Sequence, residues 1–417
     1  MATASPSFGI LQAASRLAAA VLCAGLLAAC SNNGPDSTGS LNLDPKSNLD
    51  RPMVKVGLLV PLSAHGQPGV IGKSLKQAAE LALFERDNPN LQLIVKDDKG
   101  TPEGARLAAE EALKSGATVL LGPMFAKSVA AVSPVARKAN VPVIAFSNDR
   151  QVAGGGVYLL SFQPTPEVER VVAYAAGRGK RRYVALIPQD PFGKLVEPVF
   201  RDAVGRSGGT VVAVETYPTG SANAMLEPLR KISAAIAAAE TEGAPVDALF
   251  VPGGQEQLEP LGRLLPQAKI NTQQVKLIGT GGMDYPNAGR ATGLVGAWYP
   301  GPDPRGWTDF AQRYGKSYSH SPPRIASLAY DAVTLAIALS GGPEGQQYSP
   351  ATITRQSGFT GIDGAYRLLA DGTADRSLAI LEVQNVGPSI IDGASSAPNR
   401  APAAVSGTSF NIFNFAQ

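Results

Sequence analysis

Apolar runs of strand length alternate with amphipathic segments of helix length from Val54 onward. Segment 70–84 has apolar residues at helical spacing and is followed by Asn88-Pro89, which is typical of a helix stop. Strands are expected at 54–60, 91–95, 118–121, 141–145 and 157–160, with helices at 70–84, from Pro102 to a cap at Gly116, and at 127–139. Strands that are separated by single helices pair in parallel, so this part of the chain predicts a parallel sheet covered by helices.

The same alternation restarts after residue 160. Helices are expected at 165–176, 192–206, 223–240 and 255–264, and strands at 183–187, 210–215, 248–251 and 275–279. The chain then offers a strand at 294–298, helices near 306–316 and 324–340, and a hairpin of strands 366–369 and 378–383 around Asp371-Gly372. Two successive doubly wound α/β units are the simplest interpretation, and the last segment is too small for a third domain.

Residues 1–29 have the pattern of a lipoprotein signal peptide. Arg16 is the only charge before the apolar run 17–29, which is shorter than the ~20 residues that span a bilayer. Small residues precede Cys30, and cleavage before it would also remove Cys23, so the mature chain keeps one cysteine and forms no internal disulfide. We expect Cys30 to be lipidated; the alternative is an ordinary secretory signal that happens to contain a cysteine.

The two segments that flank the expected domains are rich in turn formers. Residues 30–52 lack periodicity and are expected to be a flexible tether behind the lipidated cysteine. No aspartate follows Cys30, which favours anchoring to the outer membrane. Residues 392–417 form a low-complexity tail whose apolar segment 410–415 is expected to pack against its own domain or to hook onto a partner.

The composition argues against several function classes. A net charge of +3 without a long basic run predicts no nucleic-acid binding, and two His and two Cys leave little for a zinc or thiol site. Gly66–Ser74 lacks the spacing of a phosphate-binding loop, and no G-x-S-x-G motif occurs. Asp97 and Asp98 are adjacent on a strand and point to opposite faces. The sequence therefore predicts a protein that is not an enzyme and uses no cofactor or metal.

Five segments resemble the Leu/Ile/Val-binding-protein-like class of type I periplasmic binding folds. They are Val56–Ser63 (VGLLVPLS), Leu91–Asp98 (LQLIVKDD), Leu120–Ser128 (LLGPMFAKS), Val141–Ser147 (VPVIAFS) and Leu328–Ala332 (LAYDA). The resemblance implies two α/β lobes of Venus-flytrap architecture, joined by three crossings around a ligand cleft. It places lobe one at 53–160 plus 288–340 and lobe two at 161–287 plus 341–391.

The resemblance also implies which residues line the cleft. Helix starts near Lys127-Ser128 and at Phe192 are expected to point N–H groups inward, which suits an anion. In amino-acid receptors of this family two hydroxyls, a Tyr and an acid hold the ligand, and the matching positions here are Ala126, Asp149, Phe192 and Gly281. An ammonium group would therefore lack a counter-charge unless Asp149 or Asp284 replaces the acid. The cleft residues expected are Ser63, Phe125, Ala126, Lys127, Ser128, Ser147, Asn148, Asp149, Phe192, Gly281 and Asp284.

Other segments resemble a second branch of the fold, the penicillin-binding-protein-activator lipoproteins. They are Gly122–Phe125 (GPMF), Ile144–Asp149 (IAFSND), Gly156–Ser161 (GVYLLS), Gly279–Gly281 (GTG) and Phe359–Gly364 (FTGIDG). The resemblance implies a periplasmic, lipid-anchored protein that stimulates a peptidoglycan synthase. The alternative is a receptor that delivers an amino acid or another small polar ligand to an ABC transporter. A hydrolase is the least favoured hypothesis of the three.

Overall fold

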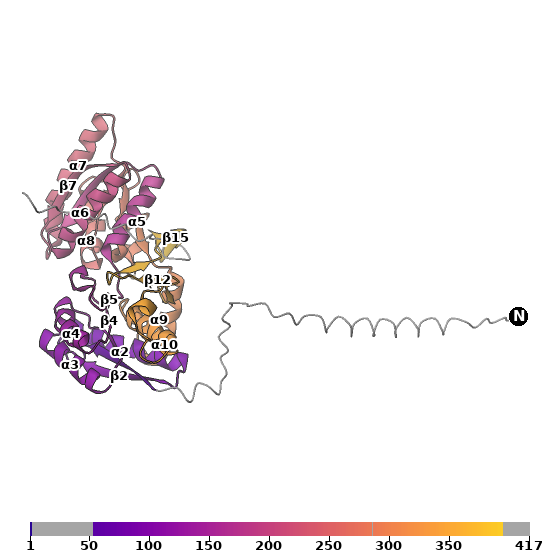
Figure 1. The fold of residues 1–417 in the computed structure, drawn as a ribbon. Coiled ribbons are helices and arrows are strands. Elements are labelled where there is room, and N and C mark those ends of the chain that lie inside the picture. The colour runs from indigo at the N-terminus through magenta and orange to yellow at the C-terminus, as the bar shows by residue number, and fades with distance from the viewer. Residues whose placement is uncertain (2–52, 286, 395–417) are drawn as a thin grey trace, which may run out of the picture. The chain divides into compact units, whose positions relative to one another are not determined.

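The computed structural model describes Met1, residues 53–285 and residues 287–394 (Figure 1). The expected signal peptide beyond Met1, the lipidated Cys30, the tether and tail residues 395–417 lie outside the described residues. All described helices and strands belong to the unit that begins at Pro52. Within the described residues, none of the helices has both the length and the apolar character needed to cross a bilayer.

The first lobe is built on a parallel sheet with strand order β2-β1-β3-β4-β5. Its strands are β1 (Val54–Val60), β2 (Leu91–Asp97), β3 (Val119–Leu121), β4 (Val143–Ala145) and β5 (Val157–Leu159). β1 lies between β2 and β3, and its side chains alternate between two cores: Val56 and Leu58 pack on one face, and Leu59 packs on the other. This confirms the parallel sheet that the alternation predicts.

Helices cover both faces of the first sheet. They are α2 (Gln67–Arg86), α3 (Pro102–Lys114), α4 (Ala126–Lys138), α9 (Pro304–Tyr318), α10 (Ala326–Ser340) and the short α11 (Pro350–Ile353). α2 and α10 pack together on one face although they are far apart in the sequence, and α3 and α4 cover the other (Figure 1). Thr101 caps α3 by accepting the N–H of Gly104 at 3.0 Å, as the motif Thr101-Pro102 predicts.

The second lobe has a sheet in the order β15-β14-β10-β9-β8-β6-β7. Five strands are parallel: β6 (Arg182–Pro188), β7 (Thr210–Tyr217), β8 (Ala248–Phe250), β9 (Lys276–Ile278) and β10 (Trp298–Gly301); β14 (Ala379–Val383) and β15 (Pro388–Asp392) add an antiparallel edge. Its helices are α5 (Pro164–Gly177), α6 (Pro191–Arg206), α7 (Leu226–Thr241) and α8 (Gln255–Gln267). α5 and α6 cover one face, and α7 and α8 cover the other.

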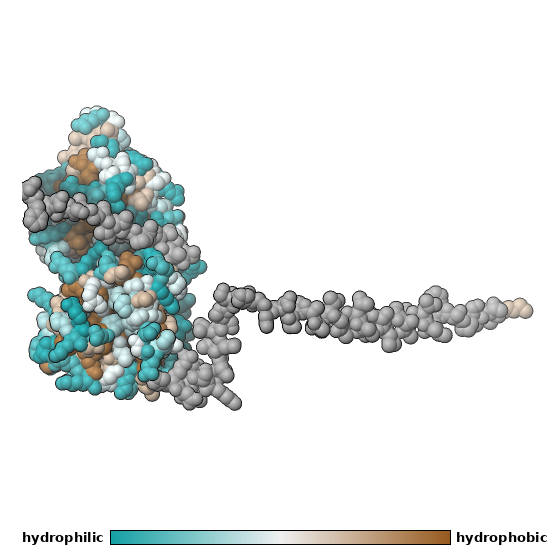
Figure 2. All heavy atoms as spheres, viewed as in Figure 1, coloured by the Kyte–Doolittle hydropathy of each residue, from teal (hydrophilic) through white to brown (hydrophobic). Residues whose placement is uncertain are grey.

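The chain passes between the lobes three times. It leaves the first sheet after β5, returns after β10 to form α9 and α10, and leaves again after β13 (Ala374–Arg376) to form β14. The two-lobe α/β architecture expected from the sequence is confirmed. Figure 2 shows polar residues over most of the visible face of the molecule, with apolar residues gathered in small patches.

The structure corrects the expected lobe boundaries. Residues 288–301 belong with the second lobe, because β10 pairs with β9 and β14 in the second sheet. Residues 341–376 belong mostly with the first lobe, because Tyr348, Ile353 and Tyr366 are buried in its core. The chain therefore returns to the first lobe near residue 303 and leaves it near residue 377. The boundaries taken from the resemblance were 288 and 341.

One expected strand and one expected strand pairing were also wrong. Residues 292–294 form a short 3-10 turn, and the strand begins only at Trp298. In the expected hairpin, β12 (Gly364–Leu368) pairs with β13 and belongs to a three-stranded sheet with β11 (Phe359–Gly361), while residues 379–383 pair with β10 in the second lobe. The turn at Asp371-Gly372 is present, but it joins β12 to β13 instead of to the strand at 379–383.

Candidate functional site

A cavity of about 450 Å³ lies where the carboxyl ends of the second sheet's strands face the first lobe. The loops after β6, β8 and β9 supply most of its wall, including Asp190, Thr280 and Asp284. The first lobe contributes Asn148, which follows β4, and Arg324, which precedes α10. Ligands of open α/β proteins bind at such carboxyl ends, and the volume is in the usual range for small-molecule sites.

The structure places four of the expected cleft residues in the wall of this cavity: Asn148, Phe192, Gly281 and Asp284. The other expected residues do not line it; they are Ser63, Phe125, Ala126, Lys127, Ser128, Ser147 and Asp149. Asp149, considered above as a replacement acid, uses its side chain to accept the N–H of Gln151 at 3.0 Å and so caps a short 3-10 turn.

The expectation of an open helix N-terminus at Phe192 needs correction. α6 begins at Pro191 and is capped by Asp190, whose carboxylate accepts the N–H of Gly193 at 2.8 Å. At the start of α8, the side-chain oxygen of Gln257 accepts the N–H of Gly254 at 3.1 Å. The start of α4, near Lys127-Ser128, does not line the cavity. Of the helix starts that reach the cavity, α6 therefore has a side-chain cap, whereas the N-cap residues of α5 and α8 provide none.

Glu167 is the main cavity residue that the sequence did not reveal. It lies in the first turn of α5 and accepts the N–H of Gly281 at 2.9 Å. A Cβ atom at position 281 would lie 2.9 Å from the Glu167 carboxylate, so the glycine leaves the space that this carboxylate occupies. Burial raises the pKa of Glu167 to about 7. In the sequence it looks like an ordinary acid that complements a helix dipole.

Arg324 forms a polar link across the cleft. Its guanidinium lies 2.5 Å from Asp363, on the first lobe, and 3.4 Å from Asp284, on the second. It also stacks on Trp307, at 4.5 Å from the ring centre, and on Phe162 at 5.2 Å. The carboxylates of Asp284 and Asp363 therefore compensate the positive charge of Arg324 without a ligand.

A buried polar cluster in the first lobe contains Asp363, the ion-pair partner of Arg324. Asp331 and Asp363 are both fully buried there. Asp331 accepts the N–H of Ile362 at 2.7 Å, and burial with the nearby Asp363 raises its pKa. Arg376, on the third crossing, stacks on Phe162 and Tyr366 and donates to the carbonyl of Ser161 at 3.3 Å.

Thr280 gives the cavity an unused hydrogen-bonding group. Its side chain is only 1% exposed, and its hydroxyl has no hydrogen-bond partner within the described part of the chain. Burying a hydroxyl without a partner is costly, so such a group is normally satisfied by water or by a ligand. With Phe162 and Phe192 as apolar walls, the cavity has the mixed character of a small-molecule site.

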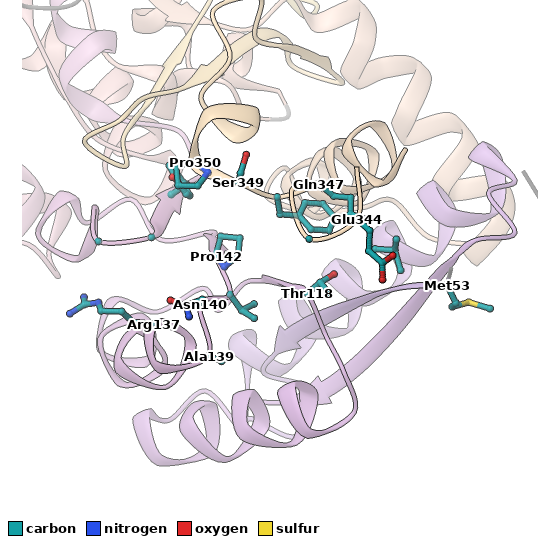
Figure 3. A pocket seen from close by; sticks show the side chains of 17 residues that line it. Met53, Thr118, Arg137, Ala139, Asn140, Pro142, Glu344, Gln347, Ser349 and Pro350 are labelled. Atoms are coloured by element: carbon teal, nitrogen blue, oxygen red, sulfur yellow. The ribbon is translucent and has the colours of Figure 1, made fainter. Parts of the chain in front are cut away.

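A larger cavity of about 710 Å³ lies at the opposite end of the first sheet (Figure 3). Figure 3 shows Glu344, Gln347 and Ser349 above it and Arg137 and Asn140 below it. In the described residues, no buried polar atom without a partner lines it. Because it lies at the amino ends of the strands, we assign the ligand site to the smaller cavity between the lobes.

The described residues offer no cluster of three or more metal-binding side chains. Both histidines, His65 and His320, are exposed and lie outside the wall of the cleft cavity. The cleft therefore contains carboxylates, one guanidinium, one free hydroxyl and aromatic rings. Such a set is chemically suited to hold a small molecule by charge, hydrogen bonds and stacking.

The chain is similar to known binding proteins. The Leu/Ile/Val-binding protein homolog 6 of Brucella abortus is 24% identical over 175 residues, which are 40% of this chain and 44% of that protein. The matched region thus spans less than half of the length of that curated relative. A putative branched-chain amino acid ABC transporter structure from Rhodospirillum rubrum matches with a TM-score of 0.71 and 19% identity, covering 81% of this chain and 100% of that one.

A second solved structure shows the same fold with a ligand. The solute binding protein of an ABC transporter from Rhodopseudomonas palustris, in complex with 3,4-dihydroxy benzoic acid, matches with a TM-score of 0.62 and 20% identity, covering 83% of this chain and 98% of that one. At these identities the likeness establishes the fold. The family of periplasmic binding proteins matches residues 53–388, which is most of the sequence. The chain therefore belongs to the periplasmic binding protein family.

Proposed function

We propose that this chain is a non-enzymatic, lipid-anchored envelope protein whose cleft binds a small polar ligand and which activates a peptidoglycan synthase. The observation that supports ligand binding is the 450 Å³ cavity between the lobes, with the buried and unpartnered hydroxyl of Thr280 in its wall. Family membership indicates a periplasmic location. The anchor at Cys30, the outer-membrane destination and the synthase are the finer parts of the proposal and come from the sequence.

The cleft differs from the amino-acid site that the family resemblance implies. Ala126 and Asp149 do not line the cavity, and Gly281 lacks a side chain. A receptor for ordinary branched-chain amino acids would need replacements for these groups. This difference favours the activator branch, whose segments Gly122–Phe125 and Ile144–Asp149 the sequence resembles.

A receptor for an ABC transporter is the second candidate. It is favoured by the solved neighbours, which are solute-binding proteins of transporters. Both candidates use the same cleft, and they differ in the protein that senses the ligand-bound form.

Reconstitution separates the two candidates. The soluble mature protein, residues 31–417, would be added to a purified peptidoglycan synthase of the same organism, and glycan polymerisation and crosslinking would be followed. The activator proposal predicts faster synthesis. An unchanged rate, together with stimulation of a cognate permease and ATPase in proteoliposomes, would refute it in favour of the receptor.

A further inference from the structure

The charges around the cleft cavity are unbalanced. Its wall carries three carboxylates, from Glu167, Asp190 and Asp284, and one guanidinium, from Arg324. That guanidinium already pairs with Asp284 and with Asp363 behind it. The cavity therefore has excess negative potential, which is unfavourable for a ligand carboxylate and favourable for a cation.

Glu167 is the acid without a charged partner. It forms no ion pair among the described residues, and its hydrogen bond comes from the neutral N–H of Gly281 at 2.9 Å. Asp284 repels it, and Arg376 lines, together with Glu167, a small cavity of about 10 Å³ without forming an ion pair with it in the described chain. The charge of Arg376 acts on the buried Asp331. Within the described chain, Glu167 therefore remains without an ion-pair partner.

Two helix starts in the cavity wall already carry a carboxylate. Asp190 caps α6, and Glu167 lies in the first turn of α5. A ligand carboxylate at either helix start would lie beside one of these like charges. The buried hydroxyl of Thr280 remains free and accepts a hydrogen bond as readily as it donates one.

We propose that the cleft binds a small organic cation, an amine or a guanidine without a carboxylate, and that Glu167 is its counter-charge. This inference rests on the proposed function only in requiring that the cleft binds a small ligand. The cation lies between Glu167 and the hydroxyl of Thr280, and its apolar part lies against Phe162 and Phe192. Aromatic faces favour such a cation further.

Binding is coupled to a proton. Burial keeps Glu167 partly protonated near neutral pH in the empty cleft, and a bound cation stabilises its ionised form. Cation binding therefore releases a proton from Glu167 below its pKa, and the affinity rises with pH until the carboxyl is fully ionised. An anionic ligand would show the opposite dependence.

Calorimetry with ligands of different charge tests the inference. The probes are putrescine, agmatine and choline as cations, leucine as a zwitterion, and 4-hydroxybenzoate as an anion. At least one cation is expected to bind, more tightly at about pH 8 than at about pH 6, with proton release shown by titration in two buffers of different ionisation heat. Glu167→Gln is expected to weaken this binding roughly tenfold or more.

The control is Glu256→Gln, which removes an exposed first-turn glutamate of α8 outside the cavity wall. It is expected to leave cation binding unchanged. Binding of leucine or 4-hydroxybenzoate without binding of any cation would overturn this inference and leave the ligand-binding proposal intact. Cation binding that is unaffected by Glu167→Gln would overturn the role of Glu167. If none of the five probes binds, the inference and the ligand-binding part of the proposed function both fail.

Discussion

Replacing Glu167 by glutamine is expected to stabilise the empty protein above about pH 7 and to have little effect at about pH 4. The folded protein raises the pKa of this carboxyl from 4.5 to about 7, mainly through burial. Each step of one in pKa corresponds to about 1.36 kcal/mol, so the ionised carboxylate costs the folded state about 3 kcal/mol. Glutamine keeps the shape and accepts the N–H of Gly281 without this cost.

The sign of the pH dependence follows from the same shift. Between pH 4.5 and about 7 the folded protein binds more protons at Glu167 than the unfolded chain does. The wild-type free energy of unfolding therefore falls across this window, relative to the variant, and the difference is constant at higher pH.

Urea unfolding of residues 31–417 at several pH values measures this difference, with Glu256→Gln as the control on another first helical turn. The variant curve is expected to separate from the wild-type curve as the pH rises through this window. Parallel curves for wild type and Glu167→Gln from about pH 4 to about pH 8 would show that Glu167 ionises as freely in the folded protein as in water, and would refute the reasoning.

Three other predictions address different parts of the molecule. Arg324→Met should lower the free energy of unfolding by about 3 kcal/mol in urea titrations, because it leaves the charge of the fully buried Asp363 without an ion-pair partner. Adding Asp363→Asn should recover much of this loss, and a double variant that is as unstable as Arg324→Met would contradict the prediction. Cys30→Ser should move the protein from the membrane fraction to the soluble fraction. Mass spectrometry that shows an unmodified Cys30 in the exported wild type would contradict the lipid anchor. Deleting 404–417 should lower the melting temperature if the apolar segment packs on its own domain, whereas an unchanged value with lost capture of a synthase would indicate a hook, and no change in either would show that the segment is dispensable.

The sequence predicted the sheets better than the cleft. Nearly continuous apolar runs such as Val54–Val60 and Arg182–Pro188 are buried on both faces, and such a run predicts a strand without knowledge of its neighbours. The lobe boundary near residue 303 was missed because β10 is only four residues long, and its place in the second sheet depends on pairing with the distant β14.

Glu167 was missed for a related reason. Its environment depends on the absence of a side chain at Gly281, which is 114 residues away in the sequence. A local pattern shows each of these residues as ordinary, an acid at a helix start and a glycine in a loop. Only the fold brings them together. For Asp149 the sequence suggested a binding role that the structure does not support. The residue matches a binding position of the family, but its carboxylate caps a turn.

The most direct test of the central claim is to identify what the cleft holds in the cell. Protein isolated from its own cell envelope would be denatured and the released small molecules measured by mass spectrometry, for wild type and two matched variants. Asn148→Trp fills the cavity from an exposed position in its wall, and Asn223→Trp makes the same change at an exposed position outside it. The account predicts an equimolar small molecule in wild type and Asn223→Trp, and none in Asn148→Trp. Equal amounts in all three proteins, or none in any, would contradict it.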